Sequence, residues 1–214
     1  MQAKQLLIIL LLILPTVFNK VRAQGNTNIK EKTLYFKTSF GFVARTMKYS
    51  DVDSQTGDEF SSGKIKGTGY NIDLQLGDHL AKAHILAIDL NYSNIPTSKF
   101  SGNDVFFDPD YELFVHEFNL GLTYLYRFLP SGFHISGTPA WSVIGFVRNS
   151  ERQKSNYGFS FGIEGGKTWP IAEGQWRFGC SASYRYTRTK TGYKDADEIL
   201  ISQPLSVSAI IGFN

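Results

Sequence analysis

Two residues of the chain have types and a spacing that could support catalysis. His134 and Ser136 are separated by one residue in an alternating segment, so their side chains point to the same face of a predicted strand. A histidine beside a hydroxyl can activate a serine nucleophile when a third, acidic group orients the histidine. No acidic residue is identifiable on the adjoining strand face. We therefore predict no catalytic site, and the other histidines and Cys180 suggest neither a metal site nor a cofactor.

A second candidate for chemistry is a set of charged residues that recur on the polar faces of alternating segments. The set comprises Arg45, Asp73, Asp89, Glu117, Glu164 and Arg185. Charges that are enclosed together must pair or stay hydrated. Pairing would make these residues a structural network, whereas an exchange of partners would make them a gate in a narrow polar pathway. Which of these two roles applies depends on the secondary-structure elements that position the charged residues.

Period-two alternation recurs along almost the whole chain after residue 33, and it predicts β-strands. From Leu34 to Arg45, one face carries Leu, Phe, Thr, Phe, Phe and Ala, and the other carries Tyr, Lys, Ser, Gly, Val and Arg. Similar patterns predict eight strands, at about residues 34–45, 67–77, 82–94, 114–128, 133–149, 157–164, 176–186 and 205–213. Pro139 cannot donate to a ladder, so we expect the fifth strand to begin at Ala140 or to carry a bulge at the proline.

The connections between these segments alternate between tight and long. The tight ones lie near 77–81, 129–132 and 170–174, and the longer, more polar ones lie near 50–66, 95–110, 150–156 and 190–204. Outer-membrane barrels have short periplasmic turns and longer external loops. The sequence therefore predicts an all-β fold, a transmembrane antiparallel up-and-down β-barrel of about eight strands.

The composition of the two faces predicts which side meets lipid. The polar face is mainly Gly, Ser and Asn with scattered charges, and such small side chains fit the narrow interior of an eight-stranded barrel. Aliphatic residues occupy the middle of the apolar rows, and aromatic residues near the strand ends favour the membrane interface. We assign to these interfacial girdles Tyr35, Tyr49, Tyr92, Tyr111, Phe128, Tyr157, Trp169, Trp176 and Tyr186. A soluble ligand-binding barrel, with its apolar face inside, is the alternative.

This orientation places the six charged residues inside the barrel. An arginine that faced lipid at the midplane would cost about 2–4 kcal/mol. Because an eight-stranded interior is just wide enough to be filled by side chains, we favour a paired structural plug over an open pathway.

The first residues indicate export. Lys4 precedes an apolar run from Leu6 to Phe18, and small residues follow at Val21 and Ala23. We expect a cleavable signal peptide at residues 1–23 and a barrel domain at 24–214, because the apolar run is shorter than the about 20 residues of a membrane-spanning helix. The three basic residues of the segment account for the net charge of +3, so no basic excess remains to bind nucleic acid.

The chain resembles the eight-stranded outer-membrane barrels typified by the OmpX and OmpA transmembrane domains and the opacity-type surface proteins. The segment from Leu205 to Phe213 alternates and ends in an aromatic residue, similar to the signal read by the barrel-assembly machinery, although Asn214 follows it. The resemblance implies a bacterial outer-membrane location. It also implies a monomer with no cofactor, whose partners are outer-membrane lipid, lipopolysaccharide and the assembly machinery.

We expect a non-enzymatic, porin-like barrel with a side-chain-filled polar lumen, which contributes to envelope integrity or presents its loops to a partner. Phe60, Phe106 and Phe107 fall in predicted loops, where exposed apolar residues can mark an interaction site. The acidic stretches beside them do not match the spacing of a calcium loop. A narrow pore and a lipid A-modifying enzyme are the alternative functions.

Overall fold

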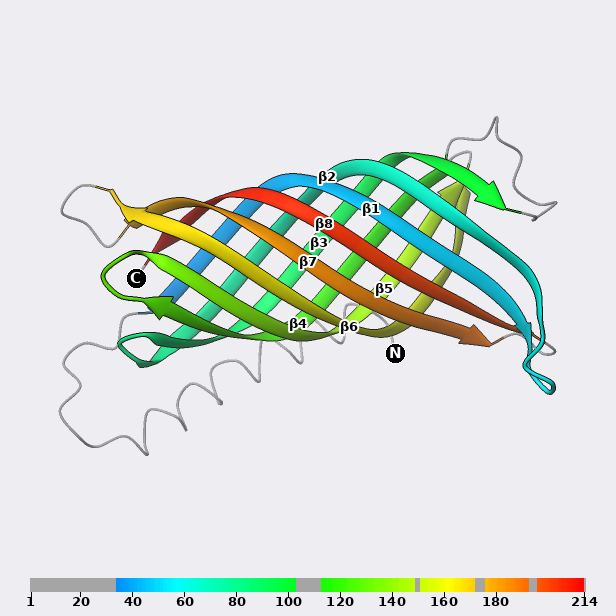
Figure 1. The fold of residues 1–214 in the computed structure, drawn as a ribbon, viewed down its shortest axis with the longest axis horizontal. Helices are drawn as coiled ribbons and strands as arrows, with labels where there is room; N and C mark the ends of the chain where they lie inside the picture. Colours follow the sequence, from blue (N-terminus) through cyan, green and yellow to red (C-terminus); the bar gives the residue numbers. More distant parts are fainter. Residues whose placement is uncertain (1–33, 103–112, 149–150, 172–175, 193–195, 214) are drawn as a thin grey trace. The chain divides into compact units, whose positions relative to one another are not determined.

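A computed structural model describes residues 34–102, 113–148, 151–171, 176–192 and 196–213. Eight antiparallel strands follow one another around a closed barrel, and the last strand pairs with the first (Figure 1). The strands are β1(Leu34–Asp53), β2(Glu59–Ala81), β3(His84–Gly102), β4(Leu113–Phe128), β5(Phe133–Arg148), β6(Glu151–Pro170), β7(Trp176–Gly192) and β8(Ala196–Phe213). Among the described residues, no helix is long and apolar enough to cross a membrane. The predicted fold class and strand count are confirmed.

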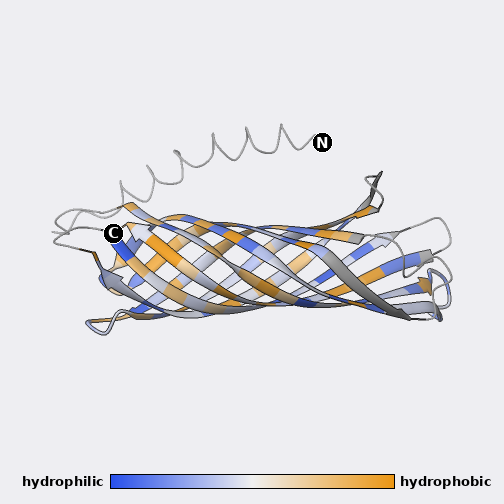
Figure 2. Ribbon diagram, turned by 90° about the horizontal axis from the view of Figure 1, so that it is seen from above, coloured by the Kyte–Doolittle hydropathy of each residue, from blue (hydrophilic) through white to orange (hydrophobic). Residues whose placement is uncertain are grey.

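Buried and more exposed residues alternate along the strands, so successive side chains point into and out of the barrel. Figure 2 shows hydrophilic and hydrophobic residues interspersed along the same strands. The outward face carries large apolar side chains that are highly exposed, such as Phe42 at 80 %, Phe159 at 77 % and Val207 at 62 %. Many polar side chains are buried inside, including Asn119 and Ser142 at 0 % exposure. A soluble barrel would have the opposite arrangement, so this part of the wall matches a lipid surface, as the composition of the faces predicts.

The strands are longer than the sequence pattern predicts. They contain between 16 and 23 residues, whereas about 9–11 tilted residues are enough to cross a bilayer. β1 runs on to Asp53 and β2 begins at Glu59, so a short turn replaces the loop expected over residues 50–66. Each strand therefore continues beyond the hydrocarbon layer.

β5 passes through Pro139 without a break or a bulge, so both expectations for this strand were wrong. Pro139 lies opposite Phe161 of β6, and the ladder to β4 is interrupted beside it but resumes in the same register at Ala140. The interruption follows from the missing N–H of proline. Inside the barrel, the hydroxyls of Thr123 and Thr138 share a hydrogen bond of 2.6 Å across the same stretch, which gives the two strands a side-chain link there.

Two of the tyrosines assigned to the interfacial girdles lie inside the barrel instead. Tyr35 and Tyr49 occupy inward positions of β1 and are 4 % and 5 % exposed, so their assignment was wrong. The outward, exposed members of the assigned set are Phe128, Tyr157, Trp169, Trp176 and Tyr186. Tyr92 is partly exposed on the outward face, and Tyr111 lies outside the described residues.

Candidate functional site in the barrel lumen

The inward side chains near the tight turns form a group of ionisable residues that reaches across the lumen. Lys37 of β1 pairs with Glu164 of β6, and its Nζ lies 3.9 Å from Asp73 Oδ2 of β2. His134 Nε2 of β5 lies 3.1 Å from Glu164 Oε1. β1 and β6 are not neighbours in the barrel, so the Lys37–Glu164 pair bridges the interior.

A glutamine links this group to the centre of the lumen. Gln75 Nε2 donates hydrogen bonds to Asp73 Oδ2 at 3.1 Å and to Asp89 Oδ2 at 3.0 Å, so one amide neutralises part of the repulsion between two carboxylates. Asp89 of β3 also accepts a hydrogen bond of 3.2 Å from Thr123 Oγ1. Arg185 Nη2 of β7 lies 3.5 Å from Asp89 Oδ1. Polar contacts therefore run continuously from the turn end to mid-barrel.

A buried ion pair lies further toward the long-loop end. Arg45 Nη2 lies 3.1 Å from Glu117 Oε2, and Glu117 is 0 % exposed. The hydroxyls of Thr187 and Ser202 donate to the two Glu117 oxygens at 2.7 and 3.0 Å, and Arg45 also donates to Ser93. Glu117 thus has an ionic partner and hydrogen bonds on both oxygens, the condition under which a buried charge is tolerated.

The structure places all six charged residues singled out in the sequence inside the barrel. Two opposite-charge pairs form among them, Arg45 with Glu117 and Arg185 with Asp89. The remaining two carboxylates meet at Lys37, which the sequence reasoning did not single out. The alternating pattern could have identified Lys37, because it lies on the same inward face of β1 as Arg45. We name the lumen around these pairs the polar section.

The adjoining strand does supply an acid for His134, so that sequence expectation was wrong. Glu164 lies directly opposite Ser136 in the β5–β6 ladder and contacts the histidine. The register that creates this contact cannot be read from residue spacing. Ser136 Oγ nevertheless forms no hydrogen bond in the described part of the chain, and all three side chains face the lumen. A serine without contact to a base is not activated as a nucleophile.

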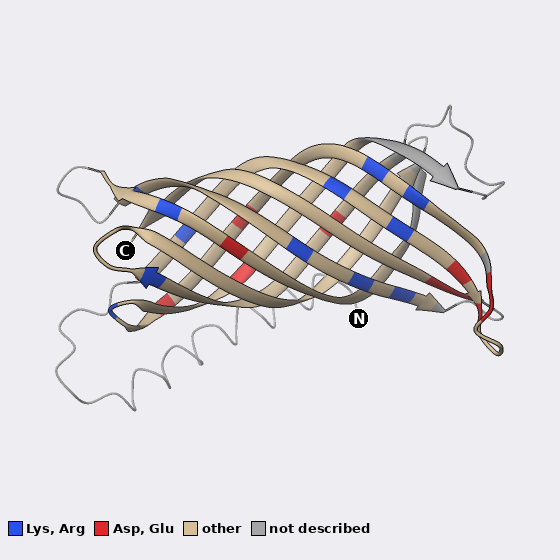
Figure 3. Ribbon diagram, in the orientation of Figure 1, with Lys and Arg blue, Asp and Glu red and all other residues tan. Residues whose placement is uncertain are grey.

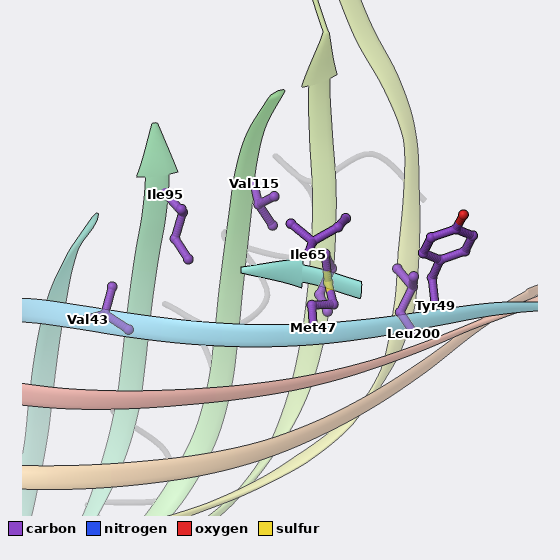
Figure 4. Packing of buried hydrophobic residues seen from close by; sticks show 8 residues of the cluster. Val43, Met47, Tyr49, Ile65, Ile95, Val115 and Leu200 are labelled. Carbon is purple, nitrogen blue, oxygen red and sulfur yellow. The ribbon is translucent and has the colours of Figure 1, made fainter. Parts of the chain in front are cut away.

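A cluster of apolar side chains fills the lumen toward the long-loop end, beyond the polar section (Figure 4). We name it the external plug. It consists of Val43, Met47, Tyr49, Ile65, Ile95, Val115, Ile144 and Leu200, each at most 5 % exposed. The side chains come from β1, β2, β3, β4, β5 and β8, so they converge from most of the circumference. The expectation of a polar lumen was therefore correct for only part of the barrel's length.

The polar section retains a small cavity. Its volume is about 40 Å³, and Asp73, Asp89, Ser136 and Arg185 are among its lining residues. A water molecule needs about 10–15 Å³ of such volume, so the cavity has room for about three waters. A volume of this size holds a few waters and is far smaller than an open channel.

Phe106 and Phe107 lie outside the described residues, and Phe60 lies in β2 with a side chain that is likewise outside the description. The acidic stretch before Phe60 forms the turn between β1 and β2. Asp53 holds this turn, because its Oδ1 accepts hydrogen bonds from the backbone N–H groups of Gln55 at 2.7 Å and Thr56 at 2.8 Å.

No known family model matches the chain, and no curated protein is similar to it in sequence. Solved structures with a similar fold exist. A neisserial surface protein, NspA, has a TM-score of 0.55 at 10 % identity over 86 % of this chain and 99 % of its own. The outer membrane protein OprG of Pseudomonas aeruginosa has a TM-score of 0.51 at 11 % identity over 86 % and 98 %.

The outer membrane protease OmpT of Escherichia coli is similar as well, with a TM-score of 0.50 at 9 % identity over 87 % of this chain and 99 % of that one. At such low identity the similarity establishes architecture and no activity. It agrees with the location expected from the sequence and with the apolar outer wall. The chain has the fold of a small bacterial outer-membrane β-barrel, with eight strands.

Proposed function

We propose that this chain is a non-enzymatic outer-membrane barrel that is closed by its own side chains. It contributes to envelope integrity or surface interaction through its wall and its external loops. The observation that carries the proposal is the external plug, which lies directly beyond the buried Arg45–Glu117 pair. A conducting path would have to displace both.

The energetic cost of opening supports a closed lumen. Removing one partner of a buried ion pair costs about 3–5 kcal/mol, and exposing a buried aliphatic side chain to water costs about 1.5–3 kcal/mol. A water-filled path would disturb several side chains of the plug at once, including Met47 and Ile144, both 0 % exposed. Spontaneous opening to a pore is therefore unfavourable by many times the thermal energy.

A narrow pore is the second candidate, and the polar cavity of about 40 Å³ is the observation that favours it. Planar-bilayer recordings of the purified chain separate the two. We expect the native chain to show no reproducible conductance steps, and a Met47→Ala/Leu200→Ala variant, which thins the plug, to be leakier. Leu205→Ala is the matched control, because Leu205 is 55 % exposed on the outward face of the same strand as Leu200. Reproducible open steps from the native chain would refute the plug.

The enzyme alternative has a separate test. His134 and Glu164 form a hydrogen-bonded pair with Ser136 nearby in register, so a hydrolase would use these three side chains. The mass spectrum of lipid A from cells that overproduce the native chain is compared with that from cells that overproduce Ser136→Ala. We expect the two spectra to be identical. A change in lipid A mass that requires Ser136 would replace the proposed function by an enzymatic one.

A further inference from the structure

The small cavity in the polar section is bordered by more negative than positive charge. Its lining includes the carboxylates of Asp73, Asp89 and Glu164, which come from β2, β3 and β6. The described lysine and arginine side chains that contact these carboxylates are Lys37 and Arg185. Figure 3 shows that acidic and basic residues in the middle of the barrel are spread over different strands. Three carboxylates thus meet two permanent cations in this part of the described chain, and one negative charge is left over.

The neutral and titratable groups around the carboxylates do not remove this excess. Gln75 donates to both Asp73 and Asp89, but an amide carries no net charge. His134 contacts Glu164 and adds a positive charge only when it is protonated. Asp73 and Asp89 are 5 % and 1 % exposed, so bulk water screens them little. A buried charge without a counter-charge is costly, and a bound cation would remove that cost.

Two buried oxygens that line the cavity form no hydrogen bond within the described part of the chain. They are Asp89 Oδ1 and Ser136 Oγ. The contact of Asp89 Oδ1 with Arg185 Nη2 at 3.5 Å does not meet hydrogen-bonding geometry. Ser136 is only 8 % exposed. Because buried polar atoms nearly always have a partner, these two oxygens indicate a ligand independently of the charge excess.

A single strand separates the two oxygens. Asp89 belongs to β3 and Ser136 to β5, and β4 lies between these strands. Thr123 of β4 donates to Asp89 Oδ2 at 3.2 Å, and its hydroxyl also shares a hydrogen bond of 2.6 Å with Thr138 Oγ1. Thr138 lies two residues from Ser136 on the same inward row of β5. Asp89 and Ser136 therefore face the cavity from the same part of the lumen wall.

The charge, the ligand types and the volume together select a monovalent metal cation. Among the described residues, no group of three or more His, Cys, Asp or Glu side chains is placed to hold a metal ion. A carboxylate-rich site of the kind that calcium prefers is therefore not supported. One positive charge balances the excess, whereas a divalent ion would exceed it. A volume of about 40 Å³ accommodates a small ion with about two waters.

We propose that the polar section binds one alkali metal cation, Na⁺ or K⁺, between Asp89 and Ser136. Asp89 Oδ1 supplies a charged ligand, Ser136 Oγ supplies a neutral one, and water completes the coordination. Asp73 and Glu164 contribute negative potential around the ion. The cation gives the lumen the positive charge that its side chains lack. This inference goes beyond the proposed function and does not depend on whether the barrel conducts.

Equilibrium unfolding of the full chain in phosphatidylcholine vesicles tests the proposal. The measurement is made at alkaline pH, so that few protons compete for the carboxylates. NaCl or KCl is mixed with choline chloride at constant ionic strength, because choline is too large for a cavity of about 40 Å³. A ligand that binds only the folded state stabilises that state. Above the dissociation constant, each tenfold rise in Na⁺ or K⁺ should raise the folding equilibrium constant about tenfold, which is about 1.4 kcal/mol.

Two variants locate the site. Asp89→Asn removes the charged ligand and should abolish the difference between alkali and choline salts. Ser136→Ala removes the neutral ligand and should move the response to a cation concentration about tenfold higher. Ser142→Ala is the matched control and should respond as the native chain does. Ser142 is a buried inward hydroxyl of the same strand that donates to Asn119, and it is not one of the described residues that line the cavity.

Three results would overturn the proposal. Equal stabilisation by choline would reduce the effect to ionic strength. An unchanged alkali dependence in Ser136→Ala, which keeps every buried charge and is expected to fold, would place the ion elsewhere. Stability that responds to pH but to neither alkali ion would show that a proton supplies the missing charge. Conductance of the native chain would refute the plug and leave these results unaffected.

Discussion

The membrane section and the external section of this barrel have opposite polarity, although the same strands form both. On the membrane section of β1, Phe40 and Phe42 point outward while Lys37 and Ser39 point inward. A few residues further, Met47 points inward and Lys48 points outward. The first arrangement suits a wall in lipid, and the second is that of a soluble barrel with a hydrophobic core. The solvent around the wall decides which face is apolar.

The two sections are also held together by different interactions. In the external plug, packing of aliphatic side chains is non-directional and tolerates small adjustments. In the polar section, each buried charge needs a partner at hydrogen-bonding geometry, so the loss of one atom leaves another unsatisfied. Substitutions in the two sections should therefore lower the free energy of unfolding by different amounts. They should also differ in whether a second substitution can restore that loss.

The largest effect is expected at the buried ion pair. Glu117→Ala leaves Arg45 without its 3.1 Å ionic partner and should lower the free energy of unfolding by about 3–5 kcal/mol. Denaturant unfolding in lipid vesicles measures it. Adding Arg45→Met to the same chain should restore part of the loss, because the unpaired charge is then gone. A cost below 1 kcal/mol would mean that water reaches the pair and that the two sections differ less than the structure implies.

The next effect concerns the external plug. Leu200→Ala removes a side chain that is 1 % exposed and should cost about 2–5 kcal/mol through lost burial and a residual cavity. Leu205→Ala, five residues along β8 and facing outward at 55 % exposure, should cost clearly less under the same conditions. Equal costs would show that the external section has no true core.

A smaller loss is expected where a charge keeps other partners. Arg185→Met removes the 3.5 Å contact to Asp89, but Gln75 and Thr123 still donate to that carboxylate. We expect a loss of about 1–3 kcal/mol in the same unfolding measurement. An unchanged denaturant midpoint would indicate that Arg185 makes its main contacts with water.

The smallest effect belongs to the turn beyond the external section. The backbone N–H groups of Thr56 and Gln55 lower the pKa of Asp53 below its ordinary value. A lowered pKa means that the carboxylate stabilises the turn above the ordinary pKa, and that this contribution disappears as the pH falls through the lowered one. The protection factors of the Gln55 and Thr56 amides, which correct the exchange rates for their intrinsic pH dependence, should fall over that acidic range. In Asp53→Asn the same protection factors should not change with this titration.

Much of the fold could be predicted because alternation depends only on neighbouring residues. The inward and outward rows from Leu34 to Arg45 are as the sequence predicts. The predicted strand ended at Arg45, because the next residues of its polar row, Met47 and Tyr49, are apolar and aromatic. An alternating pattern in which the polar and apolar rows exchange sides is hard to distinguish from a loop. Alternation was expected to keep one face apolar along the whole strand, as it would in a single solvent. β1 instead passes from lipid into water.

The site could be predicted only in part, because its contacts depend on register and on reach across the lumen. The inward position of Arg45 and Glu117 follows from alternation, whereas their pairing depends on the stagger of β1 and β4 around the barrel. The same holds for His134 and Glu164, which lie 30 residues apart. Loop lengths set that stagger, and residue spacing does not reveal it.

The seam between β1 and β8 has a consequence for how the chain reaches its native state. All 18 residues of β8 are paired with β1, from Ala196 opposite Asp53 to Phe213 opposite Phe36. These are the most distant strands in the chain, so the seam is the contact of highest loop-closure entropy and should form late. Until then the sheet has two long edges with unpaired backbone groups, which are templates for aggregation. A chaperone that shields one edge until closure would therefore reduce aggregation at this step.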